Sequence, residues 1–400
     1  MTSQNSKGKS VLVLTHNFPR HPGDVSGVFL KHLIDKLSDS VDFTILAPHD
    51  KGLPEVETDD GLEIHRFRYA SDDDETLAYR GEMHIYLKKR PLAILRFIRS
   101  YRKTAIRLAH ESSPDLIWAH WWVPGGLVGM KAKGESHIPL IVTCHGTDIF
   151  LLNKFTWIRG LAAKVFRAAK RITVVSSFLK DQLVDVLRDK VDGIEDKIVV
   201  VPMPVNADAF FYDEKIEPES GSIISASRLT SQKHLDKLVH AVSKLAEDGV
   251  RFKLDIYGDG PERDNLQRLI ESLNLEDRVS IHRSINQKEL AEKYRRSQIA
   301  VLASEREGFG LMLLEAMICG CVGIGANSGG ITDIIDNDGK DGILVEPGDV
   351  DSLYGSLKRL LSDEALIKKL RDSCRKSAEA RFSSDAIAQK FLDVLDRQSE

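Results

Sequence analysis

The sequence has little cysteine and almost no net charge, and each scarcity excludes a class of protein. Cysteine occurs four times in 400 residues. Cys319 and Cys321 form a C-x-C pair, but no second pair stands at the spacing of a zinc site, so we expect buried, reduced core residues. The formal net charge is −4, which argues against a general polyanion binder, so nucleic acid is not an expected partner. Any positive site must be local.

Segments that direct a chain to a membrane are also missing from the sequence. No run of about 18 apolar residues is present to suggest a span. Met1–Ser10 is short and polar, and it lacks the charged, apolar and small-residue pattern of a secretory signal. We therefore expect a cytoplasmic protein. Its 42% hydrophobic and 29% charged content is that of an ordinary globular chain, long enough for two domains.

What the sequence has in abundance is alternation between apolar strands and amphipathic helices. Several strands are continuous Val/Ile/Leu runs, which are typical of parallel strands covered on both faces. The alternation predicts right-handed crossovers and mostly parallel sheets. We predict one helix over Gln232–Glu247 and a helical segment over Asp363–Glu400. The predicted strands are Val11–His16, Phe43–Pro48, Leu62–Arg68, Leu116–His120, Leu140–Cys144, Ile172–Ser176, Ile198–Pro202, Ser222–Ser227, Lys253–Tyr257, Val279–Ile281, Ala300–Ala303, Val322–Ala326 and Ile343–Val345.

The strands fall into two series separated by the segment Pro202–Ser220. This segment holds three prolines and no apolar periodicity, so it reads as a linker. The predicted fold class is α/β, with two doubly wound Rossmann-like domains facing across a cleft. In such folds ligands bind beyond the carboxyl ends of the strands, so the loops that follow the strands are the candidate sites.

The strongest motif is the stretch from Glu307 to Met317, where a buried strand leads through a loop with two glycines into a helix. Glu315 is the only charged residue between Glu307 and Asp333, and a carboxylate is costly to bury on so apolar a helix. The helix start offers free N–H groups to a phosphate, and Gly308 and Gly310 allow close backbone approach. The alternative is a capping Glu307 and a core Glu315.

Two further motifs stand at strand exits. Arg228 and Lys233 follow the strand that ends at Ser227, and both side chains bind phosphate well; two solvated surface cations are the alternative. His145 and Asp148 follow the strand Leu140–Cys144, where a structural histidine bonded to Asp148 is the alternative. His120 ends the preceding strand beside two tryptophans, which either stack on sugar or belong to the core.

Together these residues resemble the retaining nucleotide-sugar transferases of glycosyltransferase family four, which adopt the GT-B fold. The resemblance covers nearly the whole chain, and Glu-x7-Glu is its most specific part, followed by the Arg/Lys pair, His-Gly-x-Asp and the run from Ser328 to Ile331. One departure is Ser26-Gly27, where the family usually has Gly-Gly in its first loop. The resemblance implies catalytic roles for His145, Glu307, Arg228 and Lys233, sugar-donor binding by Arg228, Lys233, Phe309, Gly310, Leu311, Glu315 and Gly27, and acceptor-side roles for His120 and Asp148.

The resemblance also implies roles for these side chains in the reaction. Arg228 and Lys233 would hold the diphosphate, Glu315 the ribose and Glu307 the sugar of the donor, with His145 by the reacting centre. Attack would come from the same face as the leaving group, so that the anomeric configuration is retained. No metal ion or cofactor would be needed, because the two cations and the helix start compensate the diphosphate charge.

The domain roles follow from the same resemblance. Residues 1–205 would form a Rossmann-like acceptor-side domain, and residues 206–380 a Rossmann-like domain for the nucleotide-sugar donor. Residues 381–400 would form a helix packing back on the first domain. The alternatives are a nucleotide-sugar epimerase on the same fold, a non-enzymatic two-domain sugar-binding protein, and a dehydrogenase, for which Gly258-Asp259-Gly260 lacks the third glycine of a dinucleotide fingerprint.

The acceptor is indicated by weaker patterns. A predicted helix over 91–110 carries Arg96, Arg99, Lys103 and Arg107 beside apolar Leu92, Leu95, Ile98 and Ile106, after the basic run Lys88–Arg90. This face either rests on anionic membrane, on the inner side of the plasma membrane, or is simply solvated. A saccharide or lipid-linked acceptor is expected, and His120–Gly125 resembles members that build bacterial surface polysaccharides. The acidic run Asp72–Glu75 is interpreted as a solvated loop rather than a metal site.

Overall fold

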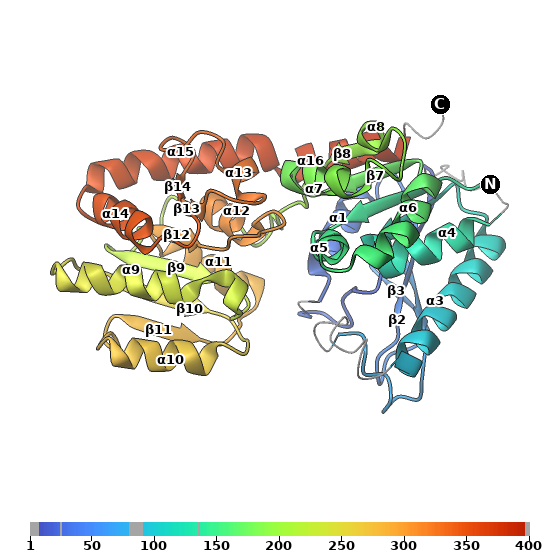
Figure 1. The fold of residues 1–400 in the computed structure, drawn as a ribbon, viewed down its shortest axis with the longest axis horizontal. Helices are drawn as coiled ribbons and strands as arrows, with labels where there is room; N and C mark the ends of the chain where they lie inside the picture. Colours follow the sequence, from blue (N-terminus) through green and yellow to red (C-terminus); the bar gives the residue numbers. More distant parts are fainter. Residues whose placement is uncertain (1–7, 25, 80–90, 135–136, 397–400) are drawn as a thin grey trace. The chain divides into compact units, whose positions relative to one another are not determined.

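The computed structural model describes residues 8–24, 26–79, 91–134 and 137–396, and these form two compact units (Figure 1). Unit 1 comprises Met1–Pro204 and Ile387–Glu400, and unit 2 comprises Val205–Ala386. The chain therefore leaves unit 1 once and returns to it through its last helix. The change of unit falls inside Pro202–Ser220, the segment that lacks apolar periodicity.

Unit 1 is built on an eight-stranded sheet with the order β3-β4-β2-β1-β5-β6-β7-β8. All neighbours pair in parallel except β3, which lies antiparallel to β4 at one edge. Strands β5 and β6 are buried along their whole length, as their apolar runs require. The strands are β1 (Ser10–Leu14), β2 (Asp42–Pro48), β3 (Val56–Asp59), β4 (Leu62–Phe67), β5 (Leu116–His120), β6 (Leu140–Cys144), β7 (Arg171–Val174) and β8 (Ile198–Val200).

Helices cover this sheet, and three of them, α3, α4 and α6, pack in succession (Figure 1). The last helix, α16, also belongs here: Phe391 lies 5.4 Å from Trp118 between ring centroids, and the Lys9 ammonium donates to the Leu395 carbonyl at 3.0 Å. The helical elements are α1 (Val28–Leu37), α3 (Pro91–Ser112), η1 (Trp121–Gly126), α4 (Leu127–Lys133), α5 (Thr147–Lys154), η2 (Thr156–Ile158), α6 (Arg159–Ala168), α7 (Ser177–Leu187), α8 (Ile194–Lys197) and α16 (Ser384–Asp396).

Unit 2 is a six-stranded, all-parallel sheet with the order β11-β10-β9-β12-β13-β14. The strands are β9 (Ser222–Ala226), β10 (Lys253–Tyr257), β11 (Val279–His282), β12 (Ile299–Leu302), β13 (Val322–Ala326) and β14 (Ile343–Val345). The helical elements are η3 (Ser231–Lys233), α9 (Leu235–Glu247), α10 (Arg263–Ser272), α11 (Gln287–Arg295), α12 (Leu311–Ile318), α13 (Ile331–Ile334), α14 (Val350–Leu361) and α15 (Glu364–Phe382).

The strand order fixes where a ligand can bind. In unit 2 the chain progresses outward from β9 to β11, then returns to the centre and progresses the other way from β12 to β14. The point of reversal lies between β9 and β12, and the loops beyond their carboxyl ends diverge there, as in doubly wound nucleotide-binding sheets. In unit 1 the same reversal lies between β1 and β5. Each unit thus has one topological switch point.

All thirteen predicted strands are confirmed, while one strand and two helix breaks within the described residues were missed. Strand β3 has the sequence Val-Glu-Thr-Asp and is largely exposed, so it carries no apolar signal. The predicted helix Gln232–Glu247 is broken at His234, which adopts a left-handed conformation with φ +49° between η3 and α9. The predicted C-terminal helical segment is likewise two helices, separated at Ser383.

Candidate functional site

The switch point of unit 2 brings two of the predicted charged residues into direct contact. Lys233 ends the turn η3 that follows β9, and Glu307 lies in the loop between β12 and α12. The Lys233 Nζ and a Glu307 carboxylate oxygen are 2.5 Å apart, and about a fifth of each side chain is exposed (18% and 20%). Residues 74 positions apart in the sequence therefore form one ion pair, at the edge of the sheet where a doubly wound fold binds its ligand.

The loops around this ion pair hold one another in place. The amide of Gly330, in the loop after β13, donates to the Glu307 carbonyl at 2.9 Å, and Ser328 Oγ donates to the Glu305 carbonyl. Gly329 has φ +65°, and a Cβ there would lie 2.5 Å from the Glu307 carbonyl oxygen, so only glycine fits. The predicted Ser-Gly-Gly motif thus fixes the backbone that carries Glu307.

The Gly-x-Gly motif after β10 has a comparable structural task. A Cβ on Gly258 would lie 1.9 Å from the Ser227 carbonyl oxygen, and the Leu229 amide donates to the Asp259 carbonyl at 2.9 Å. This loop therefore packs against the loop that carries Arg228. These glycines allow the two backbones to approach each other. They therefore serve packing between the loops and are not part of a dinucleotide fingerprint.

The start of α12 offers backbone donors to a ligand. Gly310, with φ +104°, precedes the helix, and no side chain caps the N–H groups of its first turn. The next residue, Leu311, is only half-buried, while Phe309 is buried against the ring of Phe382 at 5.6 Å between centroids. An uncapped helix start carries a partial positive charge and suits an anion.

Glu315 lies one turn further into α12 and is buried, with 8% of its surface exposed. Desolvation raises the pKa of its carboxyl group to about 8, so the protonated form is favoured at neutral pH. Such a group is poised to change protonation when hydroxyl or amide donors arrive. Among the described residues the Glu315 carboxyl group has no hydrogen bond to the backbone, which argues against the predicted alternative of a core Glu315 bonded to backbone.

Two more residues complete this site. Arg228 follows β9 and is exposed, so its guanidinium is accessible from solvent. Ser304 lies two residues after β12, with 2% of its surface exposed, and its hydroxyl has no hydrogen-bond partner among the described residues. Sequence analysis missed Ser304, because a serine near the end of a strand is common. An unpartnered buried hydroxyl beside Glu305 is nonetheless a candidate ligand contact.

The switch point of unit 1 assembles histidines and aromatic rings instead of charges. His120 ends β5 and is fully buried, and its Nδ1 lies 3.0 Å from Nε2 of His145, which follows β6. The Trp121 ring packs 4.2 Å from His145 and 4.3 Å from His16, which follows β1. Phe29 of α1 closes the group, 5.3 Å from His145. Sequence analysis predicted His120 and His145 but missed His16 and Phe29, which stand alone between unremarkable neighbours.

Burial keeps these imidazoles neutral. It lowers the pKa of His16 to about 4 and that of His145 to about 3, with a smaller contribution to the latter from His16 nearby. The pKa of His120 is lowered well below its usual range, again chiefly by desolvation. Trp121 has φ +61°, a left-handed conformation that costs a bulky residue about 1–2 kcal/mol and turns its ring onto the histidines.

Two other predicted residues hold this loop cluster in shape. The buried carboxylate of Asp148 accepts from the amides of His145 and Gly146 at 3.1 Å and from the amide of Trp122 at 3.0 Å. It therefore anchors the backbone of His145 rather than the imidazole. Gly27 precedes α1 with φ +70°, and a Cβ there would lie 2.4 Å from the Asn17 carbonyl oxygen. Gly27 lies in unit 1, whereas the other predicted donor-binding residues lie in unit 2.

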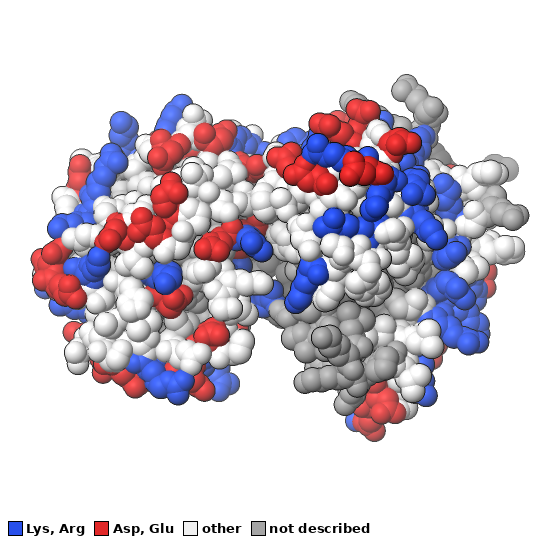
Figure 2. Space-filling view, viewed as in Figure 1, with Lys and Arg blue, Asp and Glu red and all other residues white. Residues whose placement is uncertain are grey.

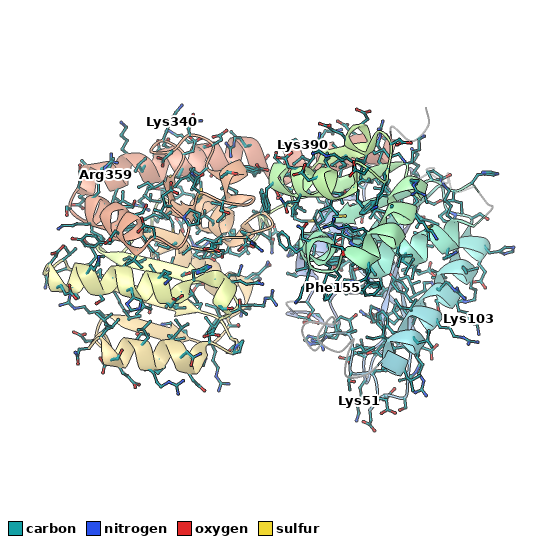
Figure 3. The ribbon with its side chains drawn as sticks, viewed as in Figure 1. Lys51, Lys103, Phe155, Lys340, Arg359 and Lys390 are labelled. Atoms are coloured by element: carbon teal, nitrogen blue, oxygen red, sulfur yellow. The ribbon has the colours of Figure 1, made fainter. Side chains whose placement is uncertain are left out.

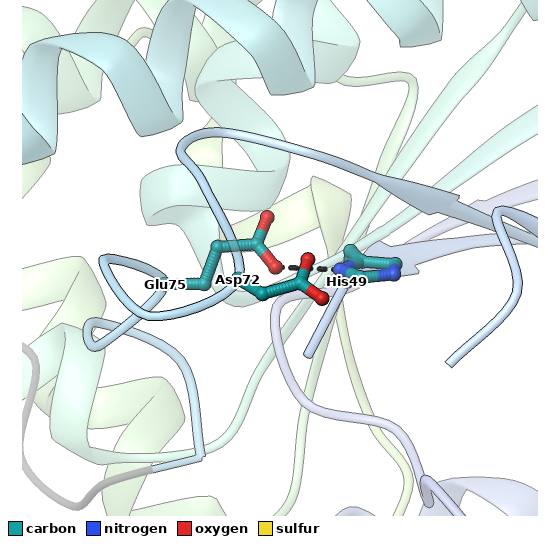
Figure 4. Close-up of side chains that lie close together, drawn as sticks. All are labelled: His49, Asp72 and Glu75. Atoms are coloured by element: carbon teal, nitrogen blue, oxygen red, sulfur yellow. Dashed lines mark hydrogen bonds and ion pairs between the residues drawn. The ribbon is translucent and has the colours of Figure 1, made fainter. Parts of the chain in front are cut away.

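One further cluster places three possible metal ligands together, His49, Asp72 and Glu75 (Figure 4). Each is already engaged by the protein: His49 Nδ1 lies 2.5 Å from Glu75, and its Nε2 donates to the Leu53 carbonyl at 2.7 Å. Glu75 also accepts from the Tyr69 amide at 3.1 Å, and Asp72 pairs with a neighbouring arginine. The interpretation of Asp72–Glu75 as a solvated loop is wrong for Glu75, which is 1% exposed because it ties this loop to the end of β2.

The remaining expectations concern cysteines and membrane spans. All four cysteines are buried and unpaired, which confirms their prediction as reduced core residues. Within the described part of the chain, no helix has both the length and the apolar character needed to span a bilayer. The basic run Lys88–Arg90 lies outside the described residues. Figure 3 shows the side chains of both units in the orientation of Figure 1.

Comparison with known proteins agrees with this geometry. Residues 207–381 match the family "Glycosyl transferases group 1", and residues 26–209 match "Glycosyltransferase Family 4". The chain is 30% identical over 298 residues to N-acetyl-alpha-D-glucosaminyl L-malate synthase of Bacillus anthracis, covering 72% of this chain and 76% of that one.

Solved structures show the same architecture. The fold matches sucrose-phosphate synthase of Thermosynechococcus elongatus with a TM-score of 0.79 at 19% identity, covering 97% of this chain and 98% of that one. It matches Anabaena HepE, solved in complex with UDP-glucose, with a TM-score of 0.72 at 18% identity over 97% and 100% of the two chains. The predicted fold class of two Rossmann-like domains is confirmed. The chain belongs to the group 1, family 4 glycosyltransferases of the GT-B fold.

Proposed function

We propose that this glycosyltransferase moves a hexose, with retention of configuration, from a nucleotide-diphosphate sugar to a saccharide or lipid-linked acceptor. The product would belong to a surface polysaccharide or glycolipid. The observation that carries the proposal is the contact between Lys233 and Glu307 at the switch point of unit 2, beside the uncapped start of α12. Cation, carboxylate and free amides gather there within one loop cluster, and a nucleotide-sugar needs all three.

The diphosphate is assigned to Arg228, Lys233 and the first amides of α12. Arg228 offers a planar fork and Lys233 a point charge, and each contact is worth roughly 4 kcal/mol at 4 Å and an effective dielectric near 20, before desolvation. The ion pair with Glu307 holds the Lys233 side chain at the switch point. Two cations and a helix start supply the compensation that a metal ion would otherwise give, so we propose that transfer needs no metal or other cofactor.

The sugar hydroxyls are assigned to the two carboxylates. Glu315 would accept from the ribose and Glu307 from the transferred sugar, and the amides of Phe309, Gly310 and Leu311, which stand between them in the sequence, would contact the donor as well. Glu315 meets an energetic condition for this role, because an ionised carboxylate in its buried position becomes favourable only when hydroxyl donors replace water. Anabaena HepE, a structural neighbour, was solved with UDP-glucose, which supports a uridine nucleotide as the first ligand to test.

The acceptor side is assigned to the histidine cluster of unit 1, with His145 next to the reacting centre. His120 Nε2 is buried without a partner among the described residues. A buried N–H without an acceptor is rarer than an unused acceptor, so the proton of His120 belongs on Nδ1, which donates to His145 Nε2. Neutral His145 then carries its own proton on Nδ1. In this assignment His145 acts as a hydrogen-bond donor to an oxygen, and His120 and Asp148 position it.

The reaction that these roles support balances without a protein nucleophile. The bond between the anomeric carbon and the diphosphate oxygen breaks, and the bond to the acceptor oxygen forms on the same face. The acceptor proton passes to the departing phosphate oxygen, while Arg228 and Lys233 stabilise the charge that develops there. His145 and Glu307 orient the sugar during this step.

A thermal-shift series tests the proposal. Purified protein is heated with UDP, GDP, ADP and their sugar conjugates, with NAD and free sugars as controls, with and without EDTA. A ligand at 100 times its dissociation constant adds roughly 2.7 kcal/mol of apparent stability. We expect stabilisation by one nucleotide family, unchanged by EDTA. Stabilisation by NAD alone, or by no nucleotide at all, would refute the assignment of the site.

A further inference from the structure

Helix α3 of unit 1 has an outer face on which basic and apolar side chains alternate. With 100° per residue, its exposed positions from Leu92 to His110 fall within an arc of about 140°, and the buried rings of Phe97 and Tyr101 lie on the opposite side; exposed Glu111 and Ser112 end the helix outside this arc. The exposed arc holds Leu92, Leu95, Arg96, Arg99, Arg102, Lys103, Ile106, Arg107 and His110. The helix thus turns one apolar face to the sheet and presents a second, mixed face to solvent.

The apolar members of this outer face are unusually exposed. Leu92 is 70% exposed, Leu95 64% and Ile106 43%, whereas Ile98, which the sequence grouped with them, is half-buried against the unit. Leaving large side chains in water is unfavourable by roughly 25 cal/mol per Å², so three of them on one face indicate a surface that is covered by something.

The charges of the face indicate what covers it. Among the five Lys and Arg side chains of α3, only Arg107 has an ion pair with a described acid, Glu111 of the same helix. Next to α3 lies α4, with Lys131 and Lys133, and α6 packs on the other side of α4. Residues 149–180, which include α6, contain seven Lys and Arg but no Asp or Glu. Blue side chains gather over these three helices in Figure 2, and Lys103 projects away from α3 in Figure 3. The chain as a whole is slightly acidic, so this positive surface is a local feature.

We infer that the outer face of α3 docks this protein on an anionic lipid surface. The leucines enter the boundary between headgroups and acyl chains, and the Arg and Lys side chains bind the lipid phosphates. An acidic soluble polymer would satisfy the charges but leave Leu92, Leu95 and Ile106 in water, so lipid explains both halves of the pattern. This inference goes beyond the proposed function, because docking needs neither the sugar donor nor transfer.

Co-sedimentation with vesicles tests the inference on the full chain without any substrate. Vesicles of phosphatidylcholine with 30% phosphatidylglycerol are compared with pure phosphatidylcholine, and heparin serves as a soluble polyanion. We expect binding to the anionic vesicles that is released at high salt, because a Debye length of about 3 Å at 1 M screens the headgroups. Binding to heparin that matches binding to anionic vesicles would overturn the lipid assignment.

Matched variants locate the contact. Arg99→Glu with Lys103→Glu should weaken vesicle binding by roughly tenfold or more, since each basic residue near an anionic surface is worth about fivefold. Leu92→Ser with Leu95→Ser, which changes no charge, should also weaken it several-fold. The control Lys368→Glu with Lys369→Glu makes the same charge change on exposed positions of α15 in unit 2 and should bind normally. Circular dichroism verifies folding, and unchanged binding by both α3 variants would overturn the inference.

Discussion

The two switch points lie at equivalent places in two doubly wound sheets, yet their chemistry is opposite. Unit 2 gathers ions, Lys233 against Glu307, with Arg228 exposed nearby and the amides of α12 uncapped. Unit 1 gathers neutral rings, with His16, His120 and His145 packed against Trp121. The same topology therefore serves two purposes, because the loops after the strands, not the sheet, determine the chemistry.

The difference also extends to the response of each site to protons. In unit 2 burial raises the pKa of Glu315 to about 8, and in unit 1 burial lowers the pKa of His16 to about 4. Desolvation acts in both, and it favours the neutral form of whichever group is buried. This contrast supports the proposed assignment of the charged diphosphate to unit 2 and of the neutral hydroxyl acceptor to unit 1.

The largest effect is expected from removing the cations of unit 2. Arg228→Ala or Lys233→Ala should lower kcat/KM by roughly 100- to 1,000-fold, because the charge on the leaving diphosphate loses a partner. The unfolding free energy should change by about 1 kcal/mol or less for exposed Arg228. For Lys233, which is 18% exposed and paired with Glu307, it should fall by about 1–3 kcal/mol. Steady-state kinetics and thermal unfolding measure the two quantities. Lys237→Ala is the control: this lysine lies in the first turn of α9, four residues after Lys233, and its removal should leave full activity.

The next effect separates binding from stability at Glu315. Affinity for a nucleotide-sugar should rise between pH 6 and pH 8 by up to about tenfold per unit, because binding requires the ionised carboxylate. A nucleotide-sugar is the right probe, since it lacks the terminal phosphate that titrates in this range. Isothermal calorimetry measures the affinity. Glu315→Gln should bind weakly at every pH, and a pH dependence that persists in this variant would assign the titration to another group.

The unfolding free energy measured without ligand should fall as pH rises, whereas the affinity for the nucleotide-sugar rises. A carboxyl whose pKa is raised on folding stabilises fully below its unfolded pKa near 4.5 and loses that contribution as pH rises through about 8. The loss is on the order of 2–4 kcal/mol between pH 5 and pH 9. Glu315→Gln lacks this pH-dependent loss of stability, so the variant should become more stable than the parent above pH 7. Hydrogen exchange of the amides of α12 measures the difference. Equal stability of the two proteins at pH 9 would contradict the buried, unpaired carboxyl.

Much of this arrangement could be predicted from the sequence, because it depends on local patterns. The parallel strands are continuous apolar runs, and their exits carry the motifs of Arg228, His145 and Glu307. Strand β3 could not be predicted, since an exposed edge strand of polar residues has no apolar period. The break at His234 was hidden because no glycine or proline marks it, and a polar first turn is ordinary in an amphipathic helix.

The rest of the two sites depends on distances that no local pattern encodes. The Lys233–Glu307 contact joins two loops that the strand order brings together, and buried Glu75 pairs with His49, which directly follows β2. His16 has no motif of its own, and only the reversal between β1 and β5 brings it to His145 through Trp121. Sequence therefore located the loops of each site, while the fold determined which side chains meet.

A smaller effect is expected from breaking the hydrogen bond between His120 and His145 in unit 1. His120→Leu removes the donor to His145 and should lower kcat roughly tenfold with little change in KM for the sugar donor, since unit 2 is untouched. His120→Asn keeps an N–H near the position of Nδ1 and should recover much of the loss. Nitrogen-15 spectra should show His145 protonated on Nδ1 in the parent and a mixture of tautomers in His120→Leu. An Nε2-protonated His145 in the parent would reverse the assigned direction of the hydrogen bond, whatever the activity.

The smallest effect is the acid sensitivity of the same site. A histidine whose pKa is lowered on folding stabilises above its unfolded pKa near 6.5 and loses that contribution as pH falls through the folded value, about 4 for His16. The unfolding free energy of unit 1 should therefore fall by an amount on the order of 1–3 kcal/mol between pH 6.5 and pH 4.

All four tryptophans lie in unit 1, so tryptophan fluorescence during urea unfolding reports this unit alone. His16→Phe preserves the ring against Trp121 and removes the titrating group. The slope of the unfolding free energy of unit 1 against pH should therefore be shallower in this variant, by the equivalent of up to one proton. Glu315→Gln should leave this slope unchanged. An equal slope in the His16→Phe variant would show that the neutral histidines do not govern the acid response of unit 1.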